Sequence, residues 1–256
     1  MLNMKNNKNV GGIVGRINDG GSLLESTATN IKAKNNSSTL SNLGGAVGNT
    51  YGEIRNIVTS VAFDQTLYAI QASGSIGGVI GYVGDSTVAT NATNSELKAT
   101  GTINLTGAGY TVGGVVGTLR QSSTAFLENA ISEVVITTPS AFGIGGIVGS
   151  ALLVAGGPYD MKFVRNYGNI SCAGTCGGII GTITDTAGSI KINNAHNYGN
   201  VTSTGFSVGG IVGAWPSNTA NSEIMESHNE GSISGDGNVG GIVGNRSGAG
   251  TGLLKK

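Results

Sequence analysis

Charged residues are scarce in this chain of 256 residues, at 11%, and the formal net charge at pH 7 is zero. Such a surface offers no electrostatic attraction for nucleic acid or an anionic membrane, so neither is expected as a partner. No apolar run approaches the roughly 20 residues of a membrane-spanning helix, and membrane insertion is not expected. Two histidines and two cysteines are too few for a closed zinc site or a disulfide framework. Aromatic residues make up only 5%, so a core must be built from Ile, Val, Leu and Ala.

Glycine is abundant, at 46 residues, and it recurs regularly. Gly-Gly pairs lie 31 to 36 residues apart and begin at Gly11, Gly44, Gly77, Gly113, Gly145, Gly177, Gly209 and Gly240. Each pair opens a Gly-Gly-apolar-apolar-Gly motif, at residues 11–15, 44–48, 77–81, 113–117, 145–149, 177–181, 209–213 and 240–244. The period predicts a single repeat array over residues 1–256, in which these eight glycines are structural.

The residues around the glycine pairs are mostly Val and Ile, which favours strands over helices. Three glycines in each motif would also weaken a helix by about 1 kcal/mol each. One repeat cannot bury its own apolar face, so neighbours must stack on it. We therefore expect an all-β, β-solenoid-like stack of about eight coils with parallel strand pairing. The coil should be right-handed, because parallel crossovers nearly always are. A chain of small antiparallel meanders is the alternative.

Two adjacent positions after each glycine pair are apolar in every repeat, as in Val115 and Val116. Side chains of a regular strand alternate between faces, so both positions cannot face the core of an unbent strand. Either the glycine pair is a bend that resets the alternation, or one apolar stripe faces outward.

A second motif, Asn-x-Gly, recurs at residues 166–168, 197–199 and 229–231. Both residue types tolerate left-handed backbone angles, so the motif predicts a tight turn. Strands should then begin at Ile170, Val201 and Ile233. The first four repeats lack this motif.

The two motifs together resemble the GLUG repeat of bacterial surface adhesins and of the N-terminal regions of some IgA-specific metallopeptidases. Residues 197–201 and 207–213 carry the resemblance, with their equivalents around Gly177 and Gly240. The glycine motif covers nearly the whole chain, with Ile, Val or Ala where the family name implies Leu. The resemblance implies an exposed, non-catalytic module of a secreted or cell-wall protein.

Few side chains indicate chemistry. His196 and His228 share a column on adjacent repeats, but no Cys or Asp accompanies them, so a solvated position is favoured over a metal site. The acidic residues fall in different columns and form no carboxylate pair of the kind that glycoside hydrolysis needs. We predict that the chain is not an enzyme and needs no metal or cofactor.

Two residue pairs leave alternatives open. Tyr167 and Tyr198 share a column and are speculative binding residues, because stacked tyrosines can form a shelf for a sugar; plain surface positions are the alternative. Cys176 fills the apolar position before a glycine pair, four residues after Cys172. A small buried hydrophobe and a local disulfide both fit this arrangement.

The sequence therefore predicts a non-catalytic adhesive or spacer module of a bacterial surface or secreted protein, located outside the cell or at its surface. The alternative is an accessory repeat region that positions a separate, peptidase-type catalytic domain. Expected partners are a host glycan or matrix protein, or further repeats of the same chain through end-to-end self-association. The first eight residues lack the apolar core of a secretory signal, so an exported protein would carry this segment within a longer chain.

Overall fold

The repeats stack as a parallel β-solenoid, which confirms the predicted fold class. The computed structural model describes residues 2–4, 9–35, 42–64, 74–84, 93–106, 109–121, 126–139, 142–153, 158–185, 188–215, 222–247 and 253–255. These residues form strands and no helix. Each coil pairs in parallel with the coils before and after it, as in β7, β10 and β13. The antiparallel meander is therefore wrong.

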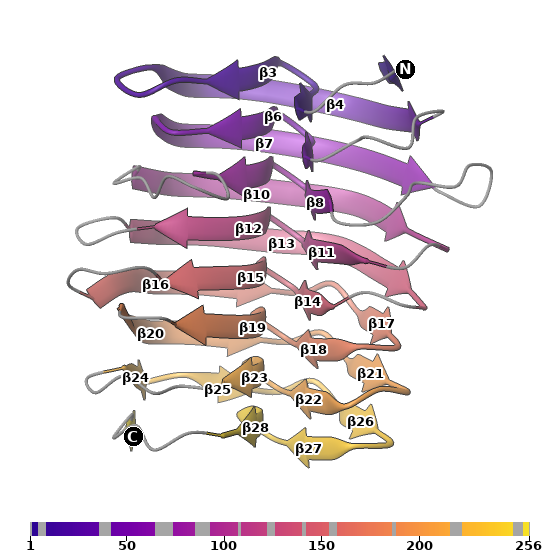
Figure 1. The fold of residues 1–256 in the computed structure, drawn as a ribbon, viewed down its shortest axis with the longest axis vertical. Helices are drawn as coiled ribbons and strands as arrows, with labels where there is room; N and C mark the ends of the chain where they lie inside the picture. The colour runs from indigo at the N-terminus through magenta and orange to yellow at the C-terminus, as the bar shows by residue number, and fades with distance from the viewer. Residues whose placement is uncertain are drawn as a thin grey trace.

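Three sheets run along the stack, and Figure 1 shows their strands as successive rungs. The first short sheet contains the strands that end on the first glycine of each pair: β2 (Asn9–Gly11), β5 (Asn42–Gly44), β8 (Gly74–Gly77), β11 (Tyr110–Gly113), β14 (Gly143–Gly145), β18 (Thr175–Gly177), β22 (Ser207–Gly209) and β27 (Asn238–Gly240). The second short sheet contains the strands that follow: β3 (Val14–Ile17), β6 (Val47–Thr50), β9 (Ile80–Val83), β12 (Val116–Gln121), β15 (Val148–Leu153), β19 (Ile180–Asp185), β23 (Val212–Trp215) and β28 (Val243–Arg246).

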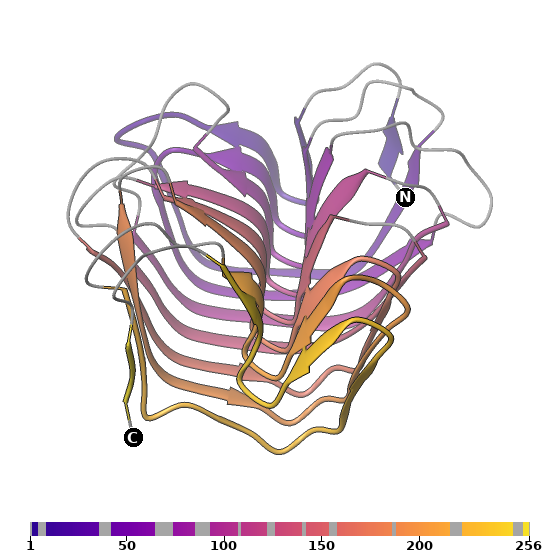
Figure 2. The ribbon, with the colours of Figure 1, turned by 60° about the horizontal axis from the view of Figure 1, so that its bottom comes forward.

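The third sheet has 13 strands and closes the coils on the opposite side. Its strands are β1 (Leu2–Met4), β4 (Ser22–Asn35), β7 (Glu53–Asp64), β10 (Thr93–Asn104), β13 (Phe126–Thr138), β16 (Pro158–Asn166), β17 (Ile170–Cys172), β20 (Ser189–Asn197), β21 (Val201–Ser203), β24 (Glu223–Met225), β25 (His228–Asn229), β26 (Ile233–Gly235) and β29 (Leu253–Lys255). Figure 2 shows these strands curving around the base of the coils, while the short strands converge on them at the glycine motifs.

The glycine pair is a bend, and the bend explains the two adjacent apolar columns. A break in the strands separates β11 from β12 at Gly114 and Val115. Val115 and Val116, on either side of its end, are both fully buried, as are their equivalents in the interior coils. The expectation of a bend that resets the alternation is therefore correct, and these columns form no outward stripe there.

Crowding at the glycines explains why no side chain is found there. A Cβ on the first glycine of a pair, such as Gly145, would overlap the carbonyl oxygen of Val148 in its own coil. A Cβ on the second, Gly146, would overlap the carbonyl oxygen of Gly178 in the next coil and the amide of Asn166 across the core. The pair therefore lets the short strands turn sharply and lets neighbouring coils stack at hydrogen-bonding distance.

The coils are of two kinds. In the first four repeats the third sheet receives one continuous strand of 12 to 14 residues per coil: β4, β7, β10 and β13. In the later coils the Asn-x-Gly motif divides this strand, so that β16 is followed by β17 and β20 by β21. Strands do begin at Ile170, Val201 and Ile233, as predicted.

The left-handed backbone lies elsewhere than predicted. Gly168, Gly199 and Gly231 do not have positive φ angles. Left-handed residues instead occupy one aligned position in each long strand, as at Asn129 (φ 53°) and Phe163 (φ 55°), where they bend the strand. Glycine is required in Asn-x-Gly for a different reason, because a Cβ at Gly168 would overlap the carbonyl oxygen of Val134 in the preceding coil.

Candidate functional site

The outer face of the third sheet carries a polar and aromatic cluster where β16, β20 and β25 lie side by side. Their register aligns Arg165 with His196 and His196 with His228. Tyr167, Tyr198 and Glu230 follow two residues later in each coil. We call these six residues the outer cluster. Alternation places them outside, because the residue between each pair, such as Asn166 or Asn197, is completely buried.

Tyr167 and Tyr198, the pair singled out in the sequence, stack on each other. Their ring centroids are 4.7 Å apart and the planes differ by 4°. Tyr167 is 47% exposed and Tyr198 is half-buried. The spacing follows from the fold, because adjacent parallel strands lie about 4.8 Å apart and hold aligned rings at stacking distance. The two rings therefore cover one face of each other and present their edges outward.

The two histidines also stack, and each contacts a residue of its own coil. The ring centroids of His196 and His228 are 3.7 Å apart. Nδ1 of His196 lies 3.3 Å from the Tyr198 hydroxyl, and Nε2 of His228 lies 3.1 Å from a carboxylate oxygen of Glu230. Desolvation lowers the pKa of His196 below its ordinary value of 6.5, helped by His228 and Arg165, while Glu230 opposes the shift. Neutral imidazole is therefore favoured at His196.

A buried ladder of asparagines holds the outer cluster in place. The Nδ2 amide of Asn166 donates to Oδ1 of Asn197 (2.8 Å), and Nδ2 of Asn197 donates to Oδ1 of Asn229 (2.6 Å). Each side chain also donates to the carbonyl oxygen of the glycine two residues on, at 2.7 to 2.9 Å. Buried amides satisfied in this way fix the turn, and the turn fixes the tyrosine or glutamate between them.

The outer cluster offers recognition more readily than catalysis. Among the described residues, no group of three or more His, Cys, Asp or Glu side chains could hold a metal ion. The histidines that the sequence placed in one column do meet, but their polar partners are a tyrosine hydroxyl and a single carboxylate. Hydrogen-bonding groups and aromatic edges on a rigid sheet can bind a ligand without activating it.

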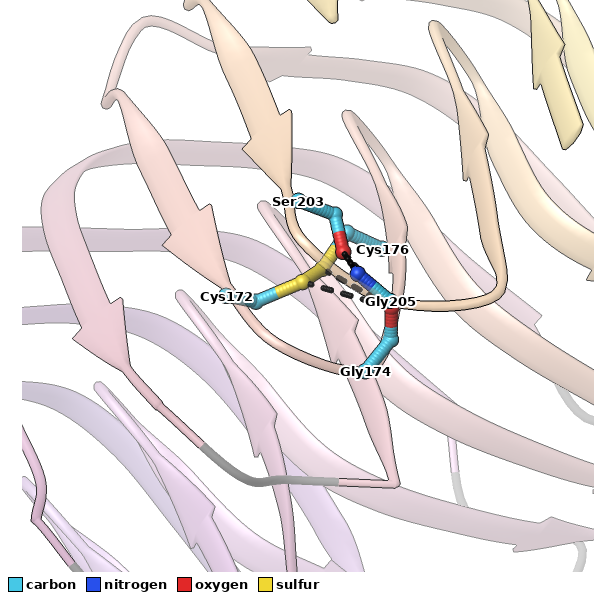
Figure 3. The surroundings of a disulfide bond; sticks show 5 residues. All are labelled: Cys172, Gly174, Cys176, Ser203 and Gly205. Carbon is cyan, nitrogen blue, oxygen red and sulfur yellow. Dashed lines mark hydrogen bonds between the residues drawn. A yellow bond between two sulfur atoms is a disulfide. The ribbon is translucent and has the colours of Figure 1, made fainter. Parts of the chain in front are cut away.

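Cys172 and Cys176 are joined by a disulfide across the turn between β17 and β18, shown in Figure 3. Their Cα atoms are 6.7 Å apart, and Cys176 is fully buried. The turn is also tied to the next coil, because the Ser203 hydroxyl donates to the carbonyl oxygen of Gly174 at 2.8 Å. Both readings of the sequence hold together, since Cys176 is a buried residue and a bonded one. Disulfides persist mainly in oxidising compartments outside the cytosol.

The sequence did not reveal the asparagine ladder or its relation to the glycines. Asn-x-Gly was visible as a turn, but nothing in the motif showed that its amide side chain points inward to face Gly146, Gly178 or Gly210. The recurrence of Asn at one column of three consecutive repeats was the available signal. Arg165 and Glu230 were not selected either, since only the register places them beside the histidines.

Comparison with known proteins supports the fold and a broad class. No protein-family model matches the chain. The sequence is 30% identical to halomucin of Haloquadratum walsbyi over 171 residues, which is 65% of this chain and 2% of halomucin. The fold is similar to that of a protein described as a putative immunoglobulin A1 protease from Bacteroides ovatus, with a TM-score of 0.54 and 22% identity over 91% of this chain and 67% of that chain. At 22% identity the likeness shows the fold alone.

The chain thus spans a very small part of halomucin and about two thirds of the solved neighbour. Both similarities are consistent with a repeat module of a surface or secreted protein. In the described part of the chain, no helix is long and apolar enough to cross a membrane.

Proposed function

We propose that the chain is a non-catalytic adhesive module of a bacterial surface or secreted protein. The observation that carries the proposal is the outer cluster, in which Tyr167, Tyr198 and the two histidines stand on a sheet locked from beneath by the asparagine ladder. A preorganised surface of this kind loses little conformational entropy on binding. The Cys172–Cys176 disulfide and the GLUG-like repeats support an extracellular or cell-surface location.

The proposed partner is a host glycan or matrix protein. Purified protein applied to an array of glycans and matrix proteins should bind specific spots, and the double variant Tyr167→Ala/Tyr198→Ala should bind them at least tenfold more weakly. Both tyrosines lie on the surface, so the melting temperature of the variant should change little. An array without binding would leave a spacer role and contradict the adhesive one. Turnover in a broad hydrolase panel would contradict the non-catalytic part.

A second candidate is an accessory region that positions a separate peptidase domain. The observation that favours it is the shared fold with the solved protein described as an immunoglobulin A1 protease. The gene around this segment distinguishes the two roles. A zinc-peptidase domain encoded next to the array would favour positioning, whereas a surface-sorting signal and more repeats would favour adhesion or spacing.

The last coil also suits stacking against a further repeat. Val239 is 47% exposed there, whereas its equivalent Val208 is fully buried. A Cβ at Gly241 would meet nothing within 4 Å, although a Cβ at the equivalent Gly210 would overlap the carbonyl oxygen of Gly241 in the next coil. The tails add β1 beside β4 and β29 beside β24, which leaves β27 and β28 each with one neighbour among the described strands.

An open strand edge with apolar side chains is a template for another strand. We expect concentration-dependent end-to-end association of the purified protein, measured by sedimentation velocity over a wide concentration range. Val239→Lys should weaken it, because a charge would have to be buried in the contact. A protein that stays monomeric at high concentration would contradict this partner.

A further inference from the structure

The turns that follow the third sheet are unequal, and the shortest one lies in a notch. Two residues, 173–174, connect β17 to β18 at the disulfide. The preceding coil uses four residues, 139–142, between β13 and β14, and the following coil uses three, 204–206, between β21 and β22. The disulfide turn is therefore recessed between two longer turns.

A cavity of about 470 Å³ opens beside this notch. Its walls come from the ends of β10, β13 and β17 and from the adjoining turns, including Leu105, Pro139 and Cys172. Hydroxyl and amide groups are spaced along it, because the register aligns Asn104 with Thr137 and places Ser171 next in the same row. The described residues that line the cavity include apolar and neutral polar side chains and no charged one.

Thr138 is the most informative residue of the lining. Its side chain is 1% exposed, and its Oγ1 atom is buried with no hydrogen-bond partner. A buried hydroxyl without a partner is costly and uncommon in native proteins. A ligand hydroxyl, or a water that a ligand brings, would satisfy it.

Two phenylalanines project from the longer turns on either side of the notch. Phe142 is 77% exposed and Phe206 is 80% exposed. Phe142 precedes β14 and Phe206 precedes β22, while Gly174 holds the corresponding place before β18 in the coil between them. Their backbones are therefore two strand spacings apart, about 9.6 Å. That interval accommodates one flat ring between two aromatic rings, and Gly174 has no side chain to fill it.

We propose that this corner binds a neutral sugar residue, with hydroxyl groups in the cavity and an apolar ring face against Phe142 or Phe206. Sugars combine hydroxyls with apolar C–H faces, and the corner offers both kinds of partner. The uncharged lining disfavours acidic sugars, because a carboxylate buried without a cation is costly. The proposal rests on the adhesive function, for which it names a ligand class at a site separate from the outer cluster.

The test is a titration of the whole chain with galactose, glucose, N-acetylgalactosamine and glucuronic acid, followed by saturation-transfer NMR and calorimetry. At least one neutral sugar should bind with a dissociation constant in the millimolar range, and glucuronic acid at least tenfold more weakly. Thr138→Val, which keeps the shape and removes the hydroxyl, should weaken binding about tenfold. Phe142→Ala/Phe206→Ala should do so as well. These two rings are exposed, so that variant should melt like the parent.

Tyr167→Ala/Tyr198→Ala is the matched control and should bind the sugars like the parent. Loss of sugar binding in this control alone would keep the adhesive function and overturn the corner as the site. No binding of any neutral sugar up to 50 mM, roughly the weakest affinity useful even in a multivalent array, would overturn the corner proposal. Array binding to a matrix protein would then still support adhesion. Binding of uncharged Ser/Thr peptides in place of sugars would identify the corner as a peptide site and overturn the sugar assignment.

Discussion

The first four coils and the later ones build the same fold around different interiors. One inward column holds Ala28, Thr59, Ala99 and Ser132 in the early coils and Asn166, Asn197 and Asn229 in the later ones. The early residues are small, and the hydroxyl of Thr59 donates to the carbonyl oxygen of Gly78 across the coil (2.7 Å). The third-sheet strand stays continuous there.

The later coils fill that space with amides that bond to one another along the stack. Each amide also takes a hydrogen bond to its own chain two residues on, which ends the strand locally. The comparison shows that a small residue lets the strand run through, whereas asparagine exchanges strand continuity for a ladder. The outer cluster occurs only where the ladder lies beneath it.

The largest expected effect concerns what both regions share, the glycine pair. Gly178→Val should prevent folding or lower stability by about 3 kcal/mol or more, because its Cβ would overlap a carbonyl oxygen of the next coil and the amide of Asn197. Gly241→Val is the matched control, since nothing lies within 4 Å of its Cβ position. Thermal melts of both variants provide the measurement. Equal melting temperatures would refute the role of crowding at the pair.

The next effect separates the two interiors. Asn197→Leu should cost about 3 kcal/mol, because it removes the hydrogen bonds to Gly199 and Asn229 and leaves the Asn166 amide without its acceptor. Ser132→Ala, at the same column of an early coil, should cost about 1 kcal/mol, since its hydroxyl accepts one bond, from the Val134 amide. Urea unfolding measures both values. Equal losses would mean that the ladder contributes no more than a single hydroxyl.

Asn94 provides the opposite case within the early coils. Its side chain is completely buried, both amide atoms lack partners, and the register places it between Ile54 and Leu127. Asn94→Leu should therefore raise stability by about 1 to 2 kcal/mol, although the same substitution at Asn197 lowers it. Urea unfolding of the two variants side by side tests the change of sign. Destabilisation at both positions would refute this reading of Asn94.

The smallest effect is a pH dependence confined to the later coils. The pKa of His196 is lowered in the folded protein, so the unfolded chain binds this proton first as the pH falls. The contribution of His196 is fully present above about pH 6.5 and is lost as the pH drops through the folded pKa. Hydrogen exchange at pH 5.0 and 7.5 should show β20 and β25 loosening at the lower pH. β10, with Lys98 in the same column, should show no histidine-linked change.

His196→Gln is the control, because it removes the titrating group and keeps a polar side chain on the outer face. The difference in stability between parent and variant should shrink as the pH falls from 7.5 to 5.0. A constant difference over that range would mean that burial and the neighbours His228 and Arg165 do not perturb the imidazole enough to matter.

Much of the fold was predictable because parallel stacking converts a sequence period directly into a structural one. The spacing of the glycine pairs predicted the coils and their parallel pairing, and the apolar columns predicted the buried positions. The candidate site was predictable only in part. Tyr167 and Tyr198 were found because equal repeat positions must lie side by side in a stack. Thr138, Phe142 and Phe206 gave no such signal, since they lie in turns whose lengths differ between repeats.

The sequence by itself determined everything that depends on position along the repeat: the strand type, the bend at each glycine pair and the neighbours along the stack. Only the tertiary structure decided what meets across a coil, because that depends on where the long strand bends and on how closely the short strands approach it. The contact of Gly146 with Asn166, the asparagine ladder and the disulfide at Cys172 all belong to this second class. Local residue preferences specify the rungs, whereas the closure of each coil places their interiors in contact.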